Sequence, residues 1–242
     1  MNLIIVENDQ ELGQKTGDLI LNKIKANKNI VLGLATGSSP ITTYKYIIEK
    51  TNQENIDWSN VRTFNLDEYK GLEPTHEQSY RYFMNQNLFD HVNIDKNNTL
   101  VPSGSVKDNE KAKEYDKLIE KAGGIDLQLL GIGINGHIGF NEPGSSFDSL
   151  TSVVDLTDLT IEANSRFFEN KNDVPTKAIS MGLKSIMKAK EIVLIAFGKN
   201  KAEAIKHLVE GPVDVQWPCS VLLNHNNVTV IVDKEAASML NS

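Results

Sequence analysis

Short apolar runs rich in Val, Ile and Leu alternate with amphipathic segments along nearly the whole chain. Several of these runs are almost continuous, which is typical of parallel strands buried on both faces. The pattern predicts strands at residues 3–6, 30–35, 61–66, 127–132, 192–197 and 228–232. It predicts helices at residues 9–26, 40–50, 76–89, 109–121, 200–209 and 234–240. This alternation predicts an α/β fold, a Rossmann-like three-layer sandwich with a mostly parallel central sheet.

Capping residues set the expected start of two helices. Pro40 suits a first helical position and Ser39 an N-cap, so we expect a helix to begin here. Thr75, with Gln78 three residues later, forms a plausible capping box ahead of residues 76–89.

Residues 150–176 depart from the strand–helix alternation. They contain a short β-like run at 152–156, a helix-like piece around 161–168 and the polar stretch ENKNDVPT. Polar, weakly packed segments of this kind form either a surface excursion or a mobile lid over a site. Both interpretations stay open at this point.

Length and charge limit the possible functions. At 242 residues the chain could form one large domain or two small ones, but no repeat or linker divides it, so we predict one domain over 1–242. The formal net charge of −7 argues against nonspecific binding to nucleic acid or to an anionic membrane. An anionic substrate would therefore need a local positive site.

Hydropathy and cysteine content bear on the compartment. No apolar run approaches the roughly 18 residues that span a bilayer, and the N-terminus lacks the pattern of a signal peptide. The single cysteine, Cys219, cannot form an internal disulfide and lies in the apolar stretch WPCSVLL. We expect a cytoplasmic protein and assign Cys219 to the core.

The first candidate site is the loop Thr36-Gly37-Ser38-Ser39, directly after a predicted strand. Free backbone N–H groups and the positive end of a helix dipole would converge there, which suits a phosphate. The simpler interpretation is that Ser-Pro merely caps a helix. No lysine of a P-loop follows, which argues against an ATPase.

The second candidate site is the pair Asp67 and Glu68 in FNLDEY, at the end of another predicted strand. Adjacent carboxylates are often simply solvated. Neighbouring side chains in extended backbone diverge, so we expect at most one of the two to face a substrate.

The third candidate site is the loop LGIGINGHIGFNEPGSS, which holds Asn135, His137 and Glu142. A histidine flanked by hydrogen-bonding partners is a candidate general acid or base, although a lone histidine is more often structural. The loop also matches GxGxxG. We discount this dinucleotide pattern because Pro143 and Gly144 follow too soon for a helix to form.

The fourth candidate site is the segment Gly198-Lys199-Asn200-Lys201, where a predicted helix begins. Lysines in a first helical turn oppose the helix dipole, so an anion bound there would account for them. Arg166 is a similar candidate, and solvated surface positions are the alternative for both. The other histidines show no metal-ligand spacing with one another or with Cys219, so we expect no metal site.

The four motifs together resemble one enzyme family. LGLATGSSP, FNLDEY, GHIGFNEPGSS and ANSRFF follow the order and spacing of glucosamine-6-phosphate deaminases, in a superfamily with 6-phosphogluconolactonases and ribose-5-phosphate isomerases. The resemblance covers nearly the whole chain, and FNLDEY with GHIGFNEP is its most specific part. It implies an isomerising hydrolase of amino-sugar catabolism that converts glucosamine 6-phosphate and water to fructose 6-phosphate and ammonium, without metal or redox cofactor.

The resemblance also implies roles for single residues. Asp67 would be the base that moves the C2 proton during enolisation. His137 would assist opening of the sugar ring, oriented by Asn135 and Glu142. The phosphate would be held by Thr36, Gly37, Ser38, Ser39, Arg166 and Lys201.

Two departures from the family pattern lead to expectations. Many members carry Asp where this chain has Asn135, and an amide lends no charge to an imidazolium, so we expect Glu142 to carry more of the pairing with His137. Hexameric members activated by N-acetylglucosamine 6-phosphate use basic residues just after NEP, whereas residues 149–155 hold no Lys or Arg. We expect hyperbolic kinetics without that activator. Whether the chain is a monomer or a homo-oligomer stays open.

Two other functions compete with this interpretation. A 6-phosphogluconolactonase, or another sugar-phosphate isomerase of the same fold, is disfavoured by FNLDEY and GHIGFNEP. A sugar-phosphate sensor of a transcriptional regulator would need a DNA-binding segment, and the first predicted strand already begins at Leu3. The expected partner is a small amino-sugar phosphate, with neither nucleic acid nor membrane.

Overall fold

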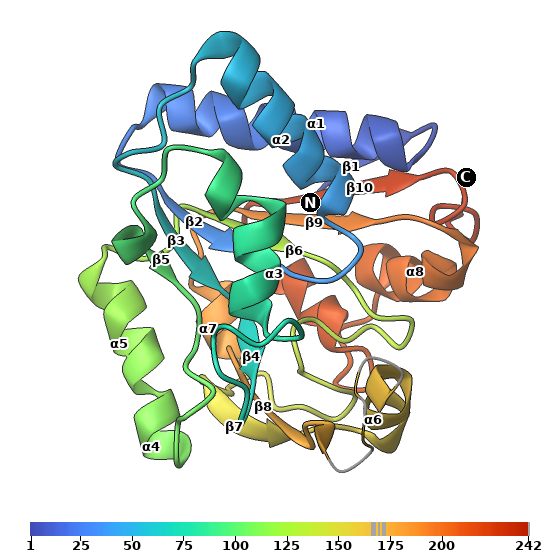
Figure 1. The fold of residues 1–242 in the computed structure, drawn as a ribbon. Coiled ribbons are helices and arrows are strands. Elements are labelled where there is room, and N and C mark those ends of the chain that lie inside the picture. Colours follow the sequence, from blue (N-terminus) through green and yellow to red (C-terminus); the bar gives the residue numbers. More distant parts are fainter. Residues whose placement is uncertain (166–167, 169, 171–172, 242) are drawn as a thin grey trace.

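The computed structural model describes residues 1–165, 168, 170 and 173–241. Within them the central sheet has the strand order β1-β10-β9-β6-β2-β3-β5, and its strand pairs are parallel (Figure 1). The strands of this sheet are β1 (Asn2–Val6), β2 (Val31–Leu34), β3 (Arg62–Asn65), β5 (Thr99–Leu100), β6 (Leu127–Leu130), β9 (Ile192–Ala196) and β10 (Val228–Asp233). The interior strands β2, β6 and β9 are buried along their length, as their apolar runs predict.

Helices cover both sides of this sheet, with α1 and α2 packed side by side on one and α7 and α8 on the other (Figure 1). The α-helices are α1 (Asp9–Ala26), α2 (Ile41–Glu54), α3 (Tyr80–Asn87), α4 (Asn109–Ala112), α5 (Glu114–Lys121), α6 (Asp158–Ser165), α7 (Leu183–Met187) and α8 (Ala202–Glu210). Short 3-10 helices are η1 (Phe89–His91), η2 (Lys96–Asn98), η4 (Lys199–Lys201) and η5 (Pro218–Asn224). The three-layer α/β fold is confirmed. No helix in the described part of the chain has the length and apolar character to cross a membrane.

A second, antiparallel sheet joins β4 (Asp67–Tyr69), β8 (Lys177–Ser180) and β7 (Ser152–Asp155) in the order β4-β8-β7. Only Leu66 separates β4 from β3. The backbone N–H of Leu66 donates to Leu34 and its carbonyl accepts from Met181, so this residue links the two sheets. The small sheet therefore begins at the carboxyl end of a central strand, and β7 fixes part of the segment considered as a lid.

Helix boundaries depart from the sequence-based expectation at several places. The helix expected at 76–89 begins only at Tyr80, and its cap is Ser79, whose hydroxyl accepts from Tyr82 N–H; the Thr75–Gln78 capping box was wrong. The helix expected at 109–121 is divided at Lys113. Residues 234–240 form turns instead of a helix. Strands β4, β5 and β8 and helix α7 were not predicted at all.

Candidate active site

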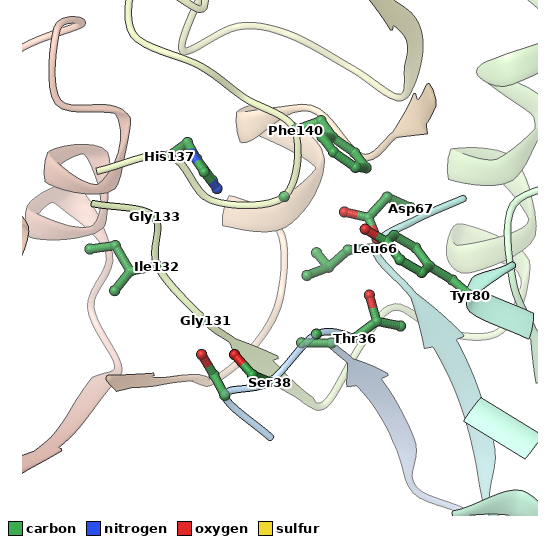
Figure 2. A pocket seen from close by; sticks show the side chains of 14 residues that line it. Thr36, Ser38, Leu66, Asp67, Tyr80, Gly131, Ile132, Gly133, His137 and Phe140 are labelled. Atoms are coloured by element: carbon green, nitrogen blue, oxygen red, sulfur yellow. The ribbon is translucent and has the colours of Figure 1, made fainter. Parts of the chain in front are cut away.

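The carboxyl ends of β2, β3 and β6 meet at a pocket of about 220 Å³. Figure 2 shows His137 on one side of this pocket, Asp67 and Tyr80 on the other, and Thr36 and Ser38 at its base. Its lining consists of Ala35, Thr36, Gly37, Ser38, Ser39, Leu66, Asp67, Tyr80, Gly131, Ile132, Gly133, His137, Gly139 and Phe140. Three of the four motifs found in the sequence thus reach one crevice, because β2 lies between β6 and β3 in the sheet.

The loop after β2 leaves the start of α2 open. The helix begins at Ile41 with Pro40 as its N-cap residue, and no side chain caps it, so the expectation that Ser39 is the cap was wrong. A turn closed by Ile41 N–H donating to the Ser38 carbonyl replaces that cap. Among the described residues, no group hydrogen-bonds to the Ser38 or Ser39 hydroxyl. These hydroxyls, and the first-turn amides other than that of Ile41, remain available to an anion.

The Asp67 side chain is only 6% exposed and lines the pocket. Burial, and then the neighbouring Glu68 carboxylate, raise the pKa of Asp67 to about 8. No described residue donates a hydrogen bond to its carboxylate. A carboxyl group with such a pKa exchanges its proton near neutral pH, which suits a general base.

The Glu68 side chain points to the other face of β4. Its carboxylate accepts hydrogen bonds from the backbone N–H groups of Tyr69, Tyr80 and Arg81, at 2.8, 2.9 and 3.0 Å. Glu68 does not line the pocket that holds Asp67. One of the two carboxylates faces the pocket, as the alternation of side chains along a strand predicts.

The His137 ring is held by Asn135. Its Nδ1 lies 2.8 Å from Asn135 Oδ1, and the Asn135 amide donates to Glu142 Oε2 at 2.8 Å. Because the carboxylate can only accept, it fixes the amide so that Oδ1 faces His137. Nδ1 therefore carries the proton, and Nε2 is the acceptor.

Glu142 acts on His137 mainly through Asn135. Its Oε1 lies 3.7 Å from His137 Nδ1, beyond a normal hydrogen bond, so its direct contact with the ring is electrostatic. The expectation that Glu142 carries more of the pairing with His137 stays a prediction. Burial lowers the pKa of His137; the Glu142 carboxylate opposes this shift and Lys201 adds to it. The imidazole is therefore neutral at neutral pH.

One glycine of the loop after β6 makes room for the histidine ring. A Cβ on Gly133 would lie 2.3 Å from the His137 ring, so only glycine fits beneath it. The side chain of Asn141 donates to the carbonyls of Ile138 and Met181, which ties the loop to the end of β8. Gly133 of the GxGxxG pattern is therefore required by the His137 ring, whereas Gly136 has a positive φ and lies against Trp217 and Cys219.

The lysine motif lies behind the pocket. Lys201 Nζ donates to the Ile132 carbonyl at 2.8 Å, and Ile132 lines the pocket while Lys201 does not. Burial lowers the pKa of Lys201. Arg166, the other cationic candidate, lies outside the described residues.

No role was predicted for the pocket residues Leu66, Ile132 and Phe140, although they lie within the quoted motifs, and Tyr80 lies outside every motif. The Tyr80 and Phe140 rings are parallel within 7° at a centroid distance of 6.2 Å. The Tyr80 hydroxyl donates to the Tyr69 hydroxyl. Only the placement of α3 beside the small sheet brings these rings together. The described residues contain no group of three or more His, Cys, Asp and Glu side chains that could hold a metal ion.

This fold and this site define a Rossmann-like α/β enzyme in which the uncapped start of a helix, a buried carboxyl group and an imidazole line one pocket. The chain belongs to the family of glucosamine-6-phosphate isomerases/6-phosphogluconolactonases, whose family model matches residues 7–231. The predicted family, and with it the prediction of an enzyme, are confirmed.

Close relatives narrow the comparison. The chain is 57% identical over 240 residues to a glucosamine-6-phosphate deaminase of Mycoplasma mycoides, covering 99% of this chain and 98% of that protein. One from Thermoanaerobacter pseudethanolicus is 56% identical over 241 residues, with 99% and 95% covered. A solved structure of a monomeric glucosamine-6-phosphate deaminase matches with a TM-score of 0.94 and 42% identity over 99% of this chain and 100% of that one. A 6-phosphogluconolactonase from Trypanosoma cruzi, at TM-score 0.74 and 21% identity over 100% and 97% of the two chains, shares the fold.

Proposed function

We propose that this chain converts glucosamine 6-phosphate and water to fructose 6-phosphate and ammonium, with Asp67 and His137 as its acid–base groups. The observation that carries the proposal is that one pocket holds an open anion-binding loop, a buried carboxyl group and a neutral imidazole. The proposal is further supported by relatives of that name at 56–57% identity over nearly the full chain.

Ring opening is the first task, and the geometry of His137 suits it. With Nδ1–H donated to Asn135, Nε2 can take the proton of the anomeric hydroxyl and return it to the ring oxygen. Glu142 holds the Asn135 amide and stabilises the imidazolium that forms transiently.

Isomerisation is the second task. In the open aldehyde the C2 proton becomes labile, and the Asp67 carboxylate removes it and returns it to C1. As the C2 amine gives up an N–H proton and becomes an imine, the C1 carbonyl oxygen takes up a proton and becomes a hydroxyl. Water then adds to C2 and releases ammonium. Thr36, Gly37, Ser38 and Ser39 hold the phosphate at the start of α2, and the proposal keeps Lys201 and Arg166 as further phosphate contacts.

The proposal also covers the domain organisation, the location and the kinetics of the protein. We propose one domain over residues 1–242 with residues 150–176 as a possible lid, a cytoplasmic location and saturation kinetics without allosteric activation. The absence of Lys and Arg from residues 149–155 supports the last point. The buried single Cys219 is compatible with a reducing compartment.

The test compares wild type with Asp67→Asn and His137→Gln in a coupled assay for fructose 6-phosphate, with ammonium release measured in parallel. We expect kcat to fall by about 10³-fold in Asp67→Asn and about 10²-fold in His137→Gln. Binding of a non-reacting sugar phosphate, measured by calorimetry, should change by less than about threefold in both.

Two results would contradict the proposal. Wild-type enzyme that releases no ammonium from glucosamine 6-phosphate, yet hydrolyses a phosphogluconolactone, would point to the lactonases. Variants that keep their turnover but lose binding of the sugar phosphate would show that Asp67 and His137 hold substrate without transferring its protons.

A further inference from the structure

Two adjacent carboxylates of β4 face two different cavities. Asp67 lines the catalytic pocket, and Glu68 lines a second cavity of about 410 Å³ between residues 71–74 and 101–105. Glu68 is only 3% exposed, although the proposed chemistry gives it no task. A buried carboxylate is costly unless its oxygens are well bonded, so its place next to the base requires an explanation.

The hydrogen bonds of Glu68 connect two elements. Oε1 accepts from the Tyr69 and Tyr80 N–H groups, and Oε2 accepts from the Arg81 N–H group. Tyr80 and Arg81 form the first turn of α3, whose next free amide, on Tyr82, is capped by the Ser79 hydroxyl. Glu68 therefore caps a helix from a neighbouring strand and ties α3 to β4.

The two connected elements form one wall of the catalytic pocket. Strand β4 carries Asp67, and the first residue of α3 is Tyr80, whose ring lies beside Asp67 (Figure 2). The Tyr80 hydroxyl returns to β4 by donating to the Tyr69 hydroxyl at 3.2 Å. The strand, Glu68, the helix and Tyr80 thus form a closed ring of contacts.

We propose that Glu68 is a positioning residue of this reaction: its carboxylate clamps the first turn of α3 onto β4 and so fixes the Asp67 base against the Tyr80 ring. The inference rests on the proposed function, since it assigns Glu68 to the same chemistry. Glu68 does not touch the substrate, because it lies on the face of β4 away from the pocket.

The charge of Glu68 supplies a signature that a purely structural clamp would lack. The titratable groups that face Asp67 are Glu68 on its own strand, Tyr80 from α3, Tyr115 from α5 and His137 across the pocket. Burial raises the pKa of both phenols well above the usual range, and His137 is neutral, so Glu68 is the neighbour whose charge raises the pKa of Asp67. Burial raises the pKa of Glu68 as well, while its three backbone N–H bonds and the Arg81 guanidinium favour its ionised form. Removing its charge should lower the pKa of Asp67.

Glu68→Gln is the sharpest variant. It keeps Oε1, the acceptor for Tyr69 and Tyr80, while its amide NH₂ opposes the Arg81 N–H and the charge is lost. We expect kcat to fall about tenfold with KM changed less than about threefold. We also expect the acid limb of kcat/KM to move down by about half a pH unit or more. Glu68→Asp, which keeps the charge but shortens the clamp, should lower kcat and leave the acid limb in place.

Asp126→Asn is the matched control. Asp126 also accepts a backbone N–H bond between elements, from Val31 at 2.8 Å, but it stands at the amino end of β6, the opposite edge of the sheet from the pocket. The variant should lose stability without any change in kcat or in the pH profile.

A second measurement does not depend on turnover. The carboxyl ¹³C resonance of Asp67, assigned with Asp67→Asn, reports its titration directly in wild type and in Glu68→Gln. A failure of the proposed function appears as wild-type protein that releases no ammonium. The positioning role is overturned if Glu68→Gln keeps wild-type kcat, or if neither the resonance nor the acid limb moves.

Discussion

Helices α1 and α2 pack against each other and each follows a parallel strand of the central sheet, yet their first turns differ. At α1, the Asn8 side chain accepts from Glu11 N–H and Glu11 in turn accepts from Glu7 N–H. At α2, no side chain caps the helix, and its first turn holds no acidic residue, whereas that of α1 holds Asp9 and Glu11. The first junction is closed by its own side chains, and the second is left open.

The difference between the junctions indicates where a ligand belongs. The open end of a helix is a ready site for an anion, and a carboxylate in the first turn competes with it. The β1–α1 junction lies at the edge of the sheet, away from the pocket, whereas the β2–α2 junction lines it. The side chains of the chain therefore satisfy the helix end that lies away from the pocket and leave free the helix end that lines it.

A carboxylate added at the open start of α2 should have the largest effect on substrate binding. Ser39→Asp puts a carboxylate where the phosphate is proposed to bind. We expect KM for glucosamine 6-phosphate to rise about tenfold to a hundredfold through like-charge repulsion. Stability should stay the same or increase slightly, because the new carboxylate meets the open amides of α2.

Asn8→Asp is the matched control, since it adds the same charge at the closed junction. Its steady-state kinetics should equal those of wild type. If Ser39→Asp leaves KM unchanged, the phosphate binds elsewhere and the difference between the two helix ends has no functional meaning.

The unpaired carboxyl group of Asp67 gives the second prediction, a pH profile. Glu11 at the closed junction is hydrogen-bonded, whereas no described group donates to Asp67. Because the pKa of Asp67 is raised to about 8, kcat/KM should fall about tenfold per pH unit below that value. The measurement is kcat/KM from about pH 6 to about pH 9, corrected for the separately titrated substrate. A profile that is flat below about pH 8 would contradict it.

The raised pKa of Asp67 also makes the free energy of unfolding depend on pH. The direction is opposite to that of most carboxylates, whose pKa is lowered by folding. In the folded protein Asp67 keeps its proton up to about pH 8, whereas in the unfolded chain it loses it near its ordinary value of about 3.9. The folded state thus binds the extra proton between these values, so its contribution to stability declines as pH rises through this window. Asp67→Asn should therefore be more stable than wild type at neutral and alkaline pH.

Much of the fold could be predicted because its strands are apolar on both faces. β2, β6, β9 and β10 consist of Val, Ile and Leu apart from one Gly in β2, one Gln in β6, one Ala in β9, and one Thr and one Asp in β10. Such apolar runs are local information in the sequence, so their burial could be predicted. β4 could not be predicted in this way. Its residues Asp67 and Glu68 are buried only because the small sheet and α3 cover them.

Some residues of the site could likewise be predicted from the sequence, and others could not. Asn135, His137 and Glu142 lie within one loop, so their association follows from the sequence, and the bonds from Asn135 follow from short local geometry. Tyr80 and Phe140 lie 60 positions apart by their numbering and meet through ring packing that no motif encodes. Side chains whose role depends on how two sheets meet are the ones that pattern analysis misses.

Removal of the N-cap of α1 should have the smallest effect, and this effect should be on stability alone. Asn8→Ala removes the acceptor for Glu11 N–H, which should lower the free energy of unfolding by about 1 kcal/mol. Urea unfolding should show a lower midpoint with an unchanged slope, because the cap is lost while the surface exposed on unfolding stays the same. The kinetics with glucosamine 6-phosphate should match wild type, since the β1–α1 junction does not line the pocket. A raised KM in Asn8→Ala would mean that the start of α1 also affects the substrate, and the division into a closed and an open helix end would fail.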